Sequence, residues 1–335
     1  MSDPLVLGFE TSCDETGVAV VRGNEILSSV LATQVDEHSR FGGVVPEIAA
    51  RAHVEAIRSL THRALRDAGV HAMDLDAVAA TQGPGLAAAL MVGFSYGKAL
   101  AWALDVPFVG VDHMEGHLFA PRFENPDYGP PAVVLLASGG HSQVVHLRDW
   151  GDYDVLGATI DDAAGEAFDK LARFLGLGFP GGPAIDQASD DGDAGSVDFP
   201  RALADRPLDL SFSGLKTAVV TYVREHHEAG DLPPMADLAA AIQEAIVDAL
   251  VTKTMNAVEA TAAAKVGGGG GVLANRRLRV RLAQACEARG VSLHLPSPQL
   301  CTDNGAMIAA AAGFHLSRGE VTGGDAEIDS GMRLG

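Results

Sequence analysis

Apolar segments separated by short polar turns open the chain and predict three strands. The strands are expected over Leu5–Phe9, Val18–Val21 and Ile26–Leu31. Apolar residues then recur every three or four positions over Ile48–Ala68, which predicts an amphipathic helix ending at Gly69. Strands followed by helices in this way indicate an α/β domain.

The same pattern restarts after two further predicted helices, Leu86–Leu104 and Met114–Ala120. Beyond them, Val133–Ala137 and Gln143–Leu147 are predicted strands on either side of a polar turn. Two strand–turn–strand openings about 125 residues apart suggest a duplicated α/β domain with a cleft between the halves.

The rest of the pattern sets the expected domain limits. The pattern predicts a helix at Asp162–Leu175, a turn rich in Pro and Gly at Phe179–Pro183, and a long helix at Ala236–Ala263. A glycine run at Gly267–Gly271, a helix capped by Asn275 and a last helix that begins at Asp303 follow. We expect a first lobe at residues 1–128, completed by a helix at 304–318, and a second lobe at 129–303. Residues 319–335 are rich in Gly and acidic residues, and we expect a flexible tail there.

Composition and charge narrow the class of protein. The chain has 335 residues, with 24 Lys and Arg against 44 Asp and Glu, which gives a net charge of −20. At face value this charge opposes binding to nucleic acid or to an anionic membrane. We find no secretory signal, no apolar run long enough to cross a bilayer, and no cysteine spacing typical of a disulfide framework or metal site. A soluble cytoplasmic protein is therefore expected.

Three glycine-rich segments are candidates for binding phosphate. Gly93–Lys98 lacks the spacing of a phosphate-binding loop, so glycines in a closely packed helix are the better interpretation. Backbone N–H groups of Ser138–Ser142 could hold an anion, although the local sequence favours an ordinary hairpin turn. Gly267–Gly271, followed by Asn275, either lets a base or ribose lie against the backbone or is a linker.

His113 and His117 lie four residues apart, so on a helix both imidazoles point the same way, as metal ligands require. With twelve histidines in the chain, such a pair also arises easily by chance. Glu115 does not directly follow the first histidine, so this is not the zinc-protease motif. Asp303, at the start of a predicted helix, is a candidate third ligand.

Further polar positions allow two interpretations each. Asp14 and Glu15 could position Mg²⁺ or act as a base, or they could form a solvated acidic turn. Ser211–Lys216 could bring a lysine to an anionic ligand or cap a helix. Arg276–Arg281 is either a solvated helix face or the best local site for a polyanion.

Taken together, these motifs resemble one family, the tRNA threonylcarbamoyladenosine synthases (TsaD) of the actin-like ATPase superfamily, formerly called glycoprotein endopeptidases. The resemblance is closest to bacterial members. The matching segments are Gly8–Thr16, Gly42–Glu47, Thr81–Gly85, His113–His117, Ser138–His141, Asp161–Lys170, Phe179–Pro183, Ser211–Lys216 and Cys301–Ala306.

The resemblance implies an α/β actin-like ATPase (ASKHA) fold, with two ribonuclease-H-like lobes around a central cleft. It implies transfer of the threonylcarbamoyl group from threonylcarbamoyl-adenylate to N6 of adenosine 37 in tRNAs that read A-starting codons. One Fe²⁺ per subunit is implied, with Zn²⁺ as another occupant, and ATP or Mg²⁺ as further ligands.

The resemblance also implies roles for single residues. His113, His117 and Asp303 would bind the metal, which would act as a Lewis acid. Asp14 and Glu15 would position the attacking amine or take its proton. The adenylate would be bound by Leu136, Ala137, Ser138, Gly139, Gly140, Asp169, Gly182, Asp186 and Asn275.

The implied partners are tRNA, a degenerate paralogue and a P-loop ATPase, with no membrane and no DNA. Because the chain is so acidic, we expect it to bind tRNA weakly by itself. The chain departs from the family at Lys265–Gly271, where extra glycines predict a shorter or looser strand.

Two other classes of function remain as alternatives. A metalloendopeptidase would need a glutamate base beside the metal-binding histidines. A non-catalytic, actin-like nucleotide-binding regulatory module would need no metal ligands.

Overall fold

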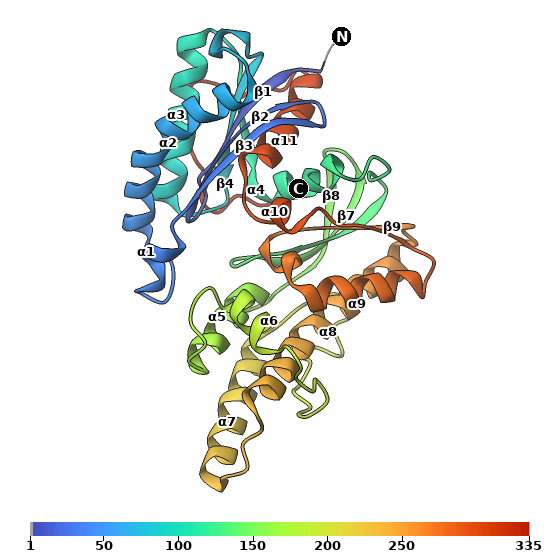
Figure 1. Ribbon diagram of the computed structural model, residues 1–335. Coiled ribbons are helices and arrows are strands. Elements are labelled where there is room, and N and C mark those ends of the chain that lie inside the picture. Colours follow the sequence, from blue (N-terminus) through green and yellow to red (C-terminus); the bar gives the residue numbers. More distant parts are fainter. Residues whose placement is uncertain (1–2, 335) are drawn as a thin grey trace. The chain divides into compact units, whose positions relative to one another are not determined.

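Two five-stranded sheets, each with its own helices, make up the protein, whose residues 3–334 are described by a computed structural model (Figure 1). They belong to two units. One unit takes both ends of the chain, Met1–Pro126 with Thr302–Leu334, and the other is Asp127–Cys301. Asp303, which the sequence analysis assigned to the second lobe, therefore belongs to the first unit.

The sheet of the first unit has the strand order β3-β2-β1-β4-β5. β1 pairs antiparallel with β2, and β2 with β3, whereas β1 pairs parallel with β4, and β4 with β5. The strands span Leu5–Glu10 (β1), Glu15–Arg22 (β2), Glu25–Thr33 (β3), Ala77–Gly83 (β4) and Phe108–Asp112 (β5). β1 carries six buried residues in a row, because helices cover both faces of this central strand.

Helices α2 and α3 cover one face of this sheet and α11 covers the other (Figure 1). The helices of the unit are α1 (Val35–Ser39), α2 (Pro46–Ala68), α3 (Ala87–Leu104), α4 (His113–Phe119) and α11 (Gly305–Ser317), with short 3₁₀ turns η1 (Ala72–Asp74) and η2 (Ala120–Phe123). Gly69 ends α2 with a φ of 68°, a left-handed conformation that favours glycine, as the sequence predicted.

Helix α11 lies unusually close to the sheet because glycines face each other at the contact. A Cβ atom built on Gly8 would lie 2.4 Å from the carbonyl oxygen of Gly305 and 2.8 Å from the amide of Ala309. A Cβ on Gly17 would lie 2.8 Å from the amide of Gly305. The first turn of α11 can therefore approach β1 and β2 only where side chains are missing.

The segment that follows α11 has no regular secondary structure but is hydrogen-bonded to the sheet. The Thr322 amide donates to the Phe108 carbonyl (2.8 Å), and the Gly110 amide donates to the Thr322 hydroxyl (2.7 Å). Further along, the Asp329 amide donates to the Gln82 carbonyl (2.9 Å). We expected a flexible tail here; the described part, 319–334, instead covers the edge strand β5 and the end of β4, and Gly335 lies outside the described residues.

Among the described helices, α3 is the one that is long and apolar enough to cross a membrane by length and composition alone. It packs on the sheet through Phe94 and Ala101, which are buried in the core of the unit. A Cβ on Gly93 would lie 2.4 Å from the Thr11 hydroxyl oxygen. The glycines of Gly93–Lys98 thus serve close packing, as predicted, and not phosphate binding.

The second unit repeats the topology of the first, with the strand order β10-β9-β6-β7-β8. β6 pairs antiparallel with β7 and β7 with β8, whereas β6 pairs parallel with β9 and β9 with β10. The strands span Ala132–Ala137 (β6), Ser142–Asp149 (β7), Asp152–Ala158 (β8), Lys265–Gly269 (β9) and Ser292–His294 (β10). The duplicated α/β fold predicted from the sequence is confirmed.

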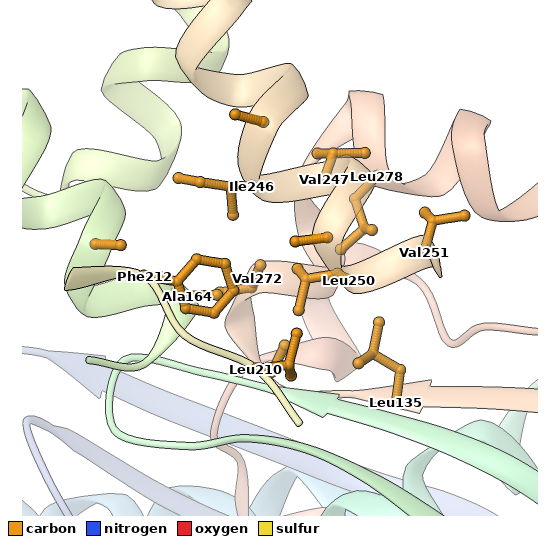
Figure 2. Packing of buried hydrophobic residues seen from close by; sticks show 14 of the residues in the cluster. Leu135, Ala164, Leu210, Phe212, Ile246, Val247, Leu250, Val251, Val272 and Leu278 are labelled. Carbon is orange, nitrogen blue, oxygen red and sulfur yellow. The ribbon is translucent and has the colours of Figure 1, made fainter. Parts of the chain in front are cut away.

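The core of the second unit lies between its sheet and the long helix α8. Figure 2 shows Ile246 and Leu250 of α8 packed beside Phe212, Leu210 and Leu135. The helices are α5 (Ala164–Phe174), α6 (Gly181–Ala188), α7 (Ser213–Ala229), α8 (Met235–Thr261), α9 (Arg276–Glu287) and α10 (Pro298–Cys301), with the 3₁₀ turn η3 (Gly271–Ala274).

Most of the glycine run forms the strand β9, so the interpretation of the run as a linker is wrong. β9 is paired on both sides, with β6 and with β10, so it is not a loose strand either. A Cβ on Gly267 would lie 2.6 Å from the Tyr128 ring, and one on Gly268 would lie 2.7 Å from Leu295. Glycines are present here because neighbouring side chains cross the strand closely.

Candidate functional site

The structure brings His113, His117 and Asp303 together inside the first unit. The Asp303 Oδ1 atom lies 3.2 Å from His117 Nε2 and 3.5 Å from His113 Nε2. One donor atom from each of the three residues lies within 4.8 Å of the others, and both histidines are buried. The i, i+4 spacing on α4 supplies two of these groups, and the loop before α11 supplies the third.

Asp112 fixes the start of α4, the helix that carries both histidines. Its Oδ1 atom accepts hydrogen bonds from the amides of Met114 (2.7 Å) and Glu115 (3.2 Å). Burial raises the pKa of Asp112 to about 6 even though these amides act in the opposite direction. All seven residues of α4 are buried, so the histidines have little freedom to move.

Glu10, at the end of β1, holds His113 from the side opposite Asp303. Its carboxylate accepts from the Ser12 amide (2.5 Å), the Thr81 hydroxyl (2.6 Å) and His113 Nδ1 (2.9 Å). Burial lowers the pKa of His113, but the carboxylates of Glu10 and Asp303 outweigh it and raise that pKa to about 10. The sequence analysis missed Glu10, whose only signal was a carboxylate at the end of an apolar strand.

The three donor groups fit a divalent transition metal. Two imidazoles and one carboxylate form the ligand set typical of Fe(II) sites with open positions, and the same groups bind Zn²⁺. Burial lowers the pKa of His117, which keeps a ring lone pair available. His117 Nδ1 is buried and has no hydrogen-bond partner among the described residues, so Nε2 is the atom that faces Asp303. Glu10, hydrogen-bonded to His113, has the place of the carboxylate that usually orients a metal-binding histidine.

Glu115 points away from these donor atoms. Its Oε2 atom lies 2.8 Å from His315 Nε2 on α11, and His315 Nδ1 lies 2.6 Å from Glu320. The hydrogen bond to Glu115 raises the pKa of His315 to about 9. This ion pair joins α4 to α11 and holds the Glu115 carboxylate away from the donor atoms of the two histidines.

The turn between β1 and β2 carries Asp14 and Glu15. Burial raises the pKa of Glu15 to about 9, and the charges of Asp14 and Asp303 add to the effect. The same causes raise the pKa of the Cys13 thiol. Glu15 is half-buried at the start of β2, so its side chain is not fully solvated.

In the second unit, Leu136 and Ala137 end β6, and Ser138–Gly140 form the turn before β7. The Gly165 amide at the start of α5 donates to the Ser138 carbonyl (3.2 Å). A Cβ atom added to Gly139 or Gly140 would meet no atom within 4 Å, so space is open beside this turn.

Asp169 and Gly182 lie at the contact between α5 and α6. Asp169 Oδ1 accepts a hydrogen bond from the Gly181 amide (2.6 Å), and a Cβ on Gly182 would also meet open space. This bond and the one from the Gly165 amide to the Ser138 carbonyl fix the end of β6, α5 and α6 relative to one another.

Gln243, a buried residue of α8, links Asp186 to Asn275. Its amide donates to Asp186 Oδ1 (3.3 Å), and its oxygen accepts from Asn275 Nδ2 (3.2 Å). Asn275 Oδ1 caps α9 by accepting from the Leu278 amide (2.9 Å), as the sequence allowed. The sequence analysis missed Gln243, although a polar side chain within an Ala-rich apolar helix was a visible signal.

Asp161 organises the Ser211–Lys216 segment. Its carboxylate accepts from the hydroxyls of Ser211 (2.5 Å) and Ser213 (2.7 Å) and from the Phe212 amide (2.8 Å). Burial opposes these bonds, but they lower the pKa of Asp161 to about 2. The segment therefore starts α7, which is the helix-capping interpretation.

The four arginines of α9 are engaged within the protein. Arg276 binds Asp186 (2.7 Å), Arg277 binds Glu244 (2.7 Å), and Arg281 binds Asp248 (2.9 Å). Arg279 donates to the Leu273 carbonyl (3.1 Å). Carboxylates of α6 and α8 pair with three of these side chains, which reduces the positive charge that α9 offers to a polyanion.

Comparisons with known proteins identify the family of this chain. Residues 25–310 match the family TsaD, tRNA N6-adenosine threonylcarbamoyltransferase. The enzyme of that name from Clostridium perfringens is 46% identical over 337 residues, which cover 100% of this chain and 99% of the relative. The one from Clostridium botulinum is 46% identical over 332 residues and 98% of each chain.

Solved structures support the fold alone. HypF from T. kodakarensis has a TM-score of 0.64 at 14% identity, over 95% of this chain and 48% of that one. The activator of the 2-hydroxyisocaproyl-CoA dehydratase from Clostridium difficile, with bound ADPNP, has a TM-score of 0.55 at 15% identity, over 95% and 98%. The full-length match at 46% identity carries the assignment. The chain belongs to the TsaD family of tRNA N6-adenosine threonylcarbamoyltransferases.

Proposed function

We propose that the chain transfers a threonylcarbamoyl group from threonylcarbamoyl-adenylate to N6 of adenosine 37 in tRNAs that read A-starting codons. The observation that carries this proposal is the convergence of His113, His117 and Asp303 in a member of this family. The substrates are inferred from the reaction of the family, and residues of this chain are assigned to the metal, the adenylate and the attacking amine.

The adenylate is assigned to the second unit. Backbone N–H groups of Ser138–Gly140 suit its phosphate, because successive amides in a turn attract anions. Open space beside Gly139 and Gly182 suits the approach of a nucleotide to the backbone. Leu136, Ala137, Asp169, Asp186 and Asn275 complete the proposed site. ATP would use the same residues if it binds.

His113, His117 and Asp303 would hold the metal, which we assign as Fe²⁺, with Zn²⁺ as the alternative occupant. When bound, the metal supplies Lewis-acid polarisation of a carbonyl or phosphate oxygen. Glu10 fixes the orientation of His113 through the 2.9 Å contact with Nδ1. Asp112 keeps both histidines on one face by fixing the start of α4.

Asp14 and Glu15 are assigned to the attacking amine. Because burial and the charge of Asp14 raise the pKa of Glu15 to about 9, Glu15 carries a proton at neutral pH. Glu15 can then donate a hydrogen bond while Asp14 accepts the proton that leaves N6. Two neighbouring carboxylates that share one proton provide both functions at once.

The proposed partners are tRNA and, as in bacterial relatives, a degenerate paralogue and a P-loop ATPase, all in the cytoplasm. The net charge of −20 and the paired arginines of α9 support dependence on partners for holding tRNA. Titration of tRNA with and without the partners at several salt concentrations tests this point.

The deciding experiment is reconstitution with the partners, tRNA, threonine, bicarbonate and ATP, followed by nucleoside mass spectrometry. We expect threonylcarbamoyladenosine with the wild type, and a loss of both bound metal and product with His113→Ala. His315→Gln, outside the donor set, is the matched histidine control and should keep its metal. Absence of modified adenosine with all partners present would reject the proposal, and cleavage of glycoproteins would favour a metalloendopeptidase. A product made equally well by the metal-free His113→Ala protein would remove the metal from the mechanism.

A further inference from the structure

Three buried polar side chains, Gln34, His38 and His53, form a cluster in the first unit that the reaction above does not use. Gln34 ends the loop after β3, His38 lies on α1, and His53 lies on α2 (Figure 1). Both histidines are 0% exposed and Gln34 is 4% exposed. Buried polar groups of this kind are retained where their hydrogen bonds are complete.

The cluster is a continuous chain of hydrogen bonds. The Val45 amide, just before α2, donates to His38 Nδ1 (3.3 Å). His38 Nε2 lies 3.1 Å from Gln34 Oε1, and Gln34 Nε2 lies 3.3 Å from His53 Nδ1. His53 Nε2 lies 3.0 Å from the carbonyl oxygen of Cys13.

The two ends of the chain fix its direction. The Val45 amide can only donate, and the Cys13 carbonyl can only accept. Consequently His38 and His53 must each carry one proton, on Nε2, and each must accept at Nδ1. The Gln34 amide cannot turn over without facing like groups on both histidines.

His53 also holds the turn that carries Asp14 and Glu15 from both sides. Its Nε2 atom donates to the Cys13 carbonyl, and its Nδ1 atom accepts from the Thr16 hydroxyl (2.8 Å). Cys13 and Thr16 immediately flank the two carboxylates. The position of the turn is thus fixed by the His53 imidazole, which is itself held by its hydrogen bond to Gln34 and, through Gln34, by His38.

We propose that Gln34, His38 and His53 are positioning residues, which hold the Asp14–Glu15 turn in register for the attacking amine and couple it to the Val35–Val45 segment. The catalytic part of this inference rests on the proposed function. The chain itself is a property of the free protein and can be tested without substrate.

The chain requires neutral histidines. A proton added to His53 Nδ1 could be accepted by the Thr16 hydroxyl, 2.8 Å away, but it would break the hydrogen bond from the Gln34 amide. A proton added to His38 Nδ1 would face the Val45 amide. The titratable groups around His53 are Glu10, Asp14 and His38. Burial lowers the pKa of His53 despite the two carboxylates, so the chain stays complete at neutral pH.

Nitrogen NMR of the wild-type protein labelled at histidine tests the chain directly. At neutral pH, His38 and His53 should each show the Nε2–H tautomer that their hydrogen bonds to Val45, Gln34 and Cys13 require. An Nδ1–H tautomer or an imidazolium at neutral pH for either residue would overturn the inference.

Gln34→Glu tests the positioning role with an isosteric side chain. A carboxylate there accepts from both histidines, so His53 should gain a proton on Nδ1 and the turn should shift. In the reconstituted reaction we expect kcat to fall about tenfold to a hundredfold with KM for tRNA nearly unchanged, and the acidic limb of the pH profile to move to higher pH.

His62→Gln, on an exposed position of the same helix, is the matched control and should leave kcat and the pH profile unchanged. A Gln34→Glu profile that coincides with the wild type would overturn the positioning role, whatever its effect on thermal stability. If the wild type makes no product with all its partners, the proposed function fails, while the NMR tautomers still decide whether the chain exists.

Discussion

Replacing Gly8 with Ala should weaken both the fold of the first unit and the metal centre. The new Cβ atom would lie 2.4 Å from the Gly305 carbonyl oxygen and 2.8 Å from the Ala309 amide, both of them backbone atoms of α11. Ordinary contacts need about 3.5 Å, so α11 must withdraw from β1 by about 1 Å. No flexible side chain can move aside to relieve this contact.

Overpacking of this kind costs about 1–3 kcal/mol, and the upper end applies because backbone meets backbone. Replacing a glycine in a strand also lowers the conformational entropy of the unfolded chain, which stabilises the folded protein by about 0.5–1 kcal/mol. We therefore expect the free energy of unfolding to fall by about 2 kcal/mol. Asp303 lies two residues before α11, so the same shift should separate its Oδ1 atom from the histidines, now 3.2 and 3.5 Å away.

Gly313→Ala is the matched control, because Gly313 lies in the same helix and a Cβ there would meet only Pro4, at 3.9 Å. This change should stabilise the protein by about 0.5–1 kcal/mol and leave the metal centre intact. Urea unfolding measures the stability, and competition with a chelator measures the metal affinity. Equal stability of Gly8→Ala and the wild type, or equal effects of both variants, would refute the reasoning.

Two more predictions concern the helices that frame the metal centre. The pKa of His315 is raised from 6.5 to about 9 by Glu115, so its contribution to stability is complete below pH 6.5 and is lost as the pH rises through 9. Because His315 is partly exposed, we expect the free energy of unfolding measured in urea to fall by about 1–2 kcal/mol over this pH range. In His315→Gln the free energy of unfolding should change less between pH 6.5 and 9. A wild-type protein whose stability does not fall over this range would contradict the prediction. Asp112→Ala removes the cap of α4 and should lower the free energy of unfolding by about 1–2 kcal/mol, whereas Asp112→Asn keeps an acceptor oxygen and should lose much less; equal losses would show that the cap is not the cause.

Much of the fold was predictable, because the first strands and α2 show clear hydrophobic patterns. β4 and β5 were missed, since Ala77–Ala80 and the short β5 lack the alternation or the bulky side chains that mark a strand. The linker interpretation of β9 was wrong because glycine runs are typical of flexible linkers, and only the neighbouring Tyr128 and Leu295 explain why small residues are needed there.

The candidate site was predictable in part. The spacing of His113 and His117 on one helix face is local and visible in the sequence. Glu10, Gln243 and the chain from Val45 to Cys13 were missed, because their partners lie far away along the chain and only folding shows which groups meet. The ion pairs of Arg276–Arg281 were unpredictable for the same reason, because their carboxylates come from α6 and α8.

The first unit is built from both ends of the chain, which affects how the protein is made. His117 and Asp303 are 186 residues apart in sequence, and the whole second unit is synthesised between them. At ~5–20 residues per second, roughly 10–40 s pass between the appearance of the histidines and that of Asp303. The second unit can fold during this interval, while β1–β5 wait without α11. The proposed set of metal ligands is therefore complete only after Asp303 has been synthesised, and chains that stop before it lack both this ligand and the helix that covers the sheet.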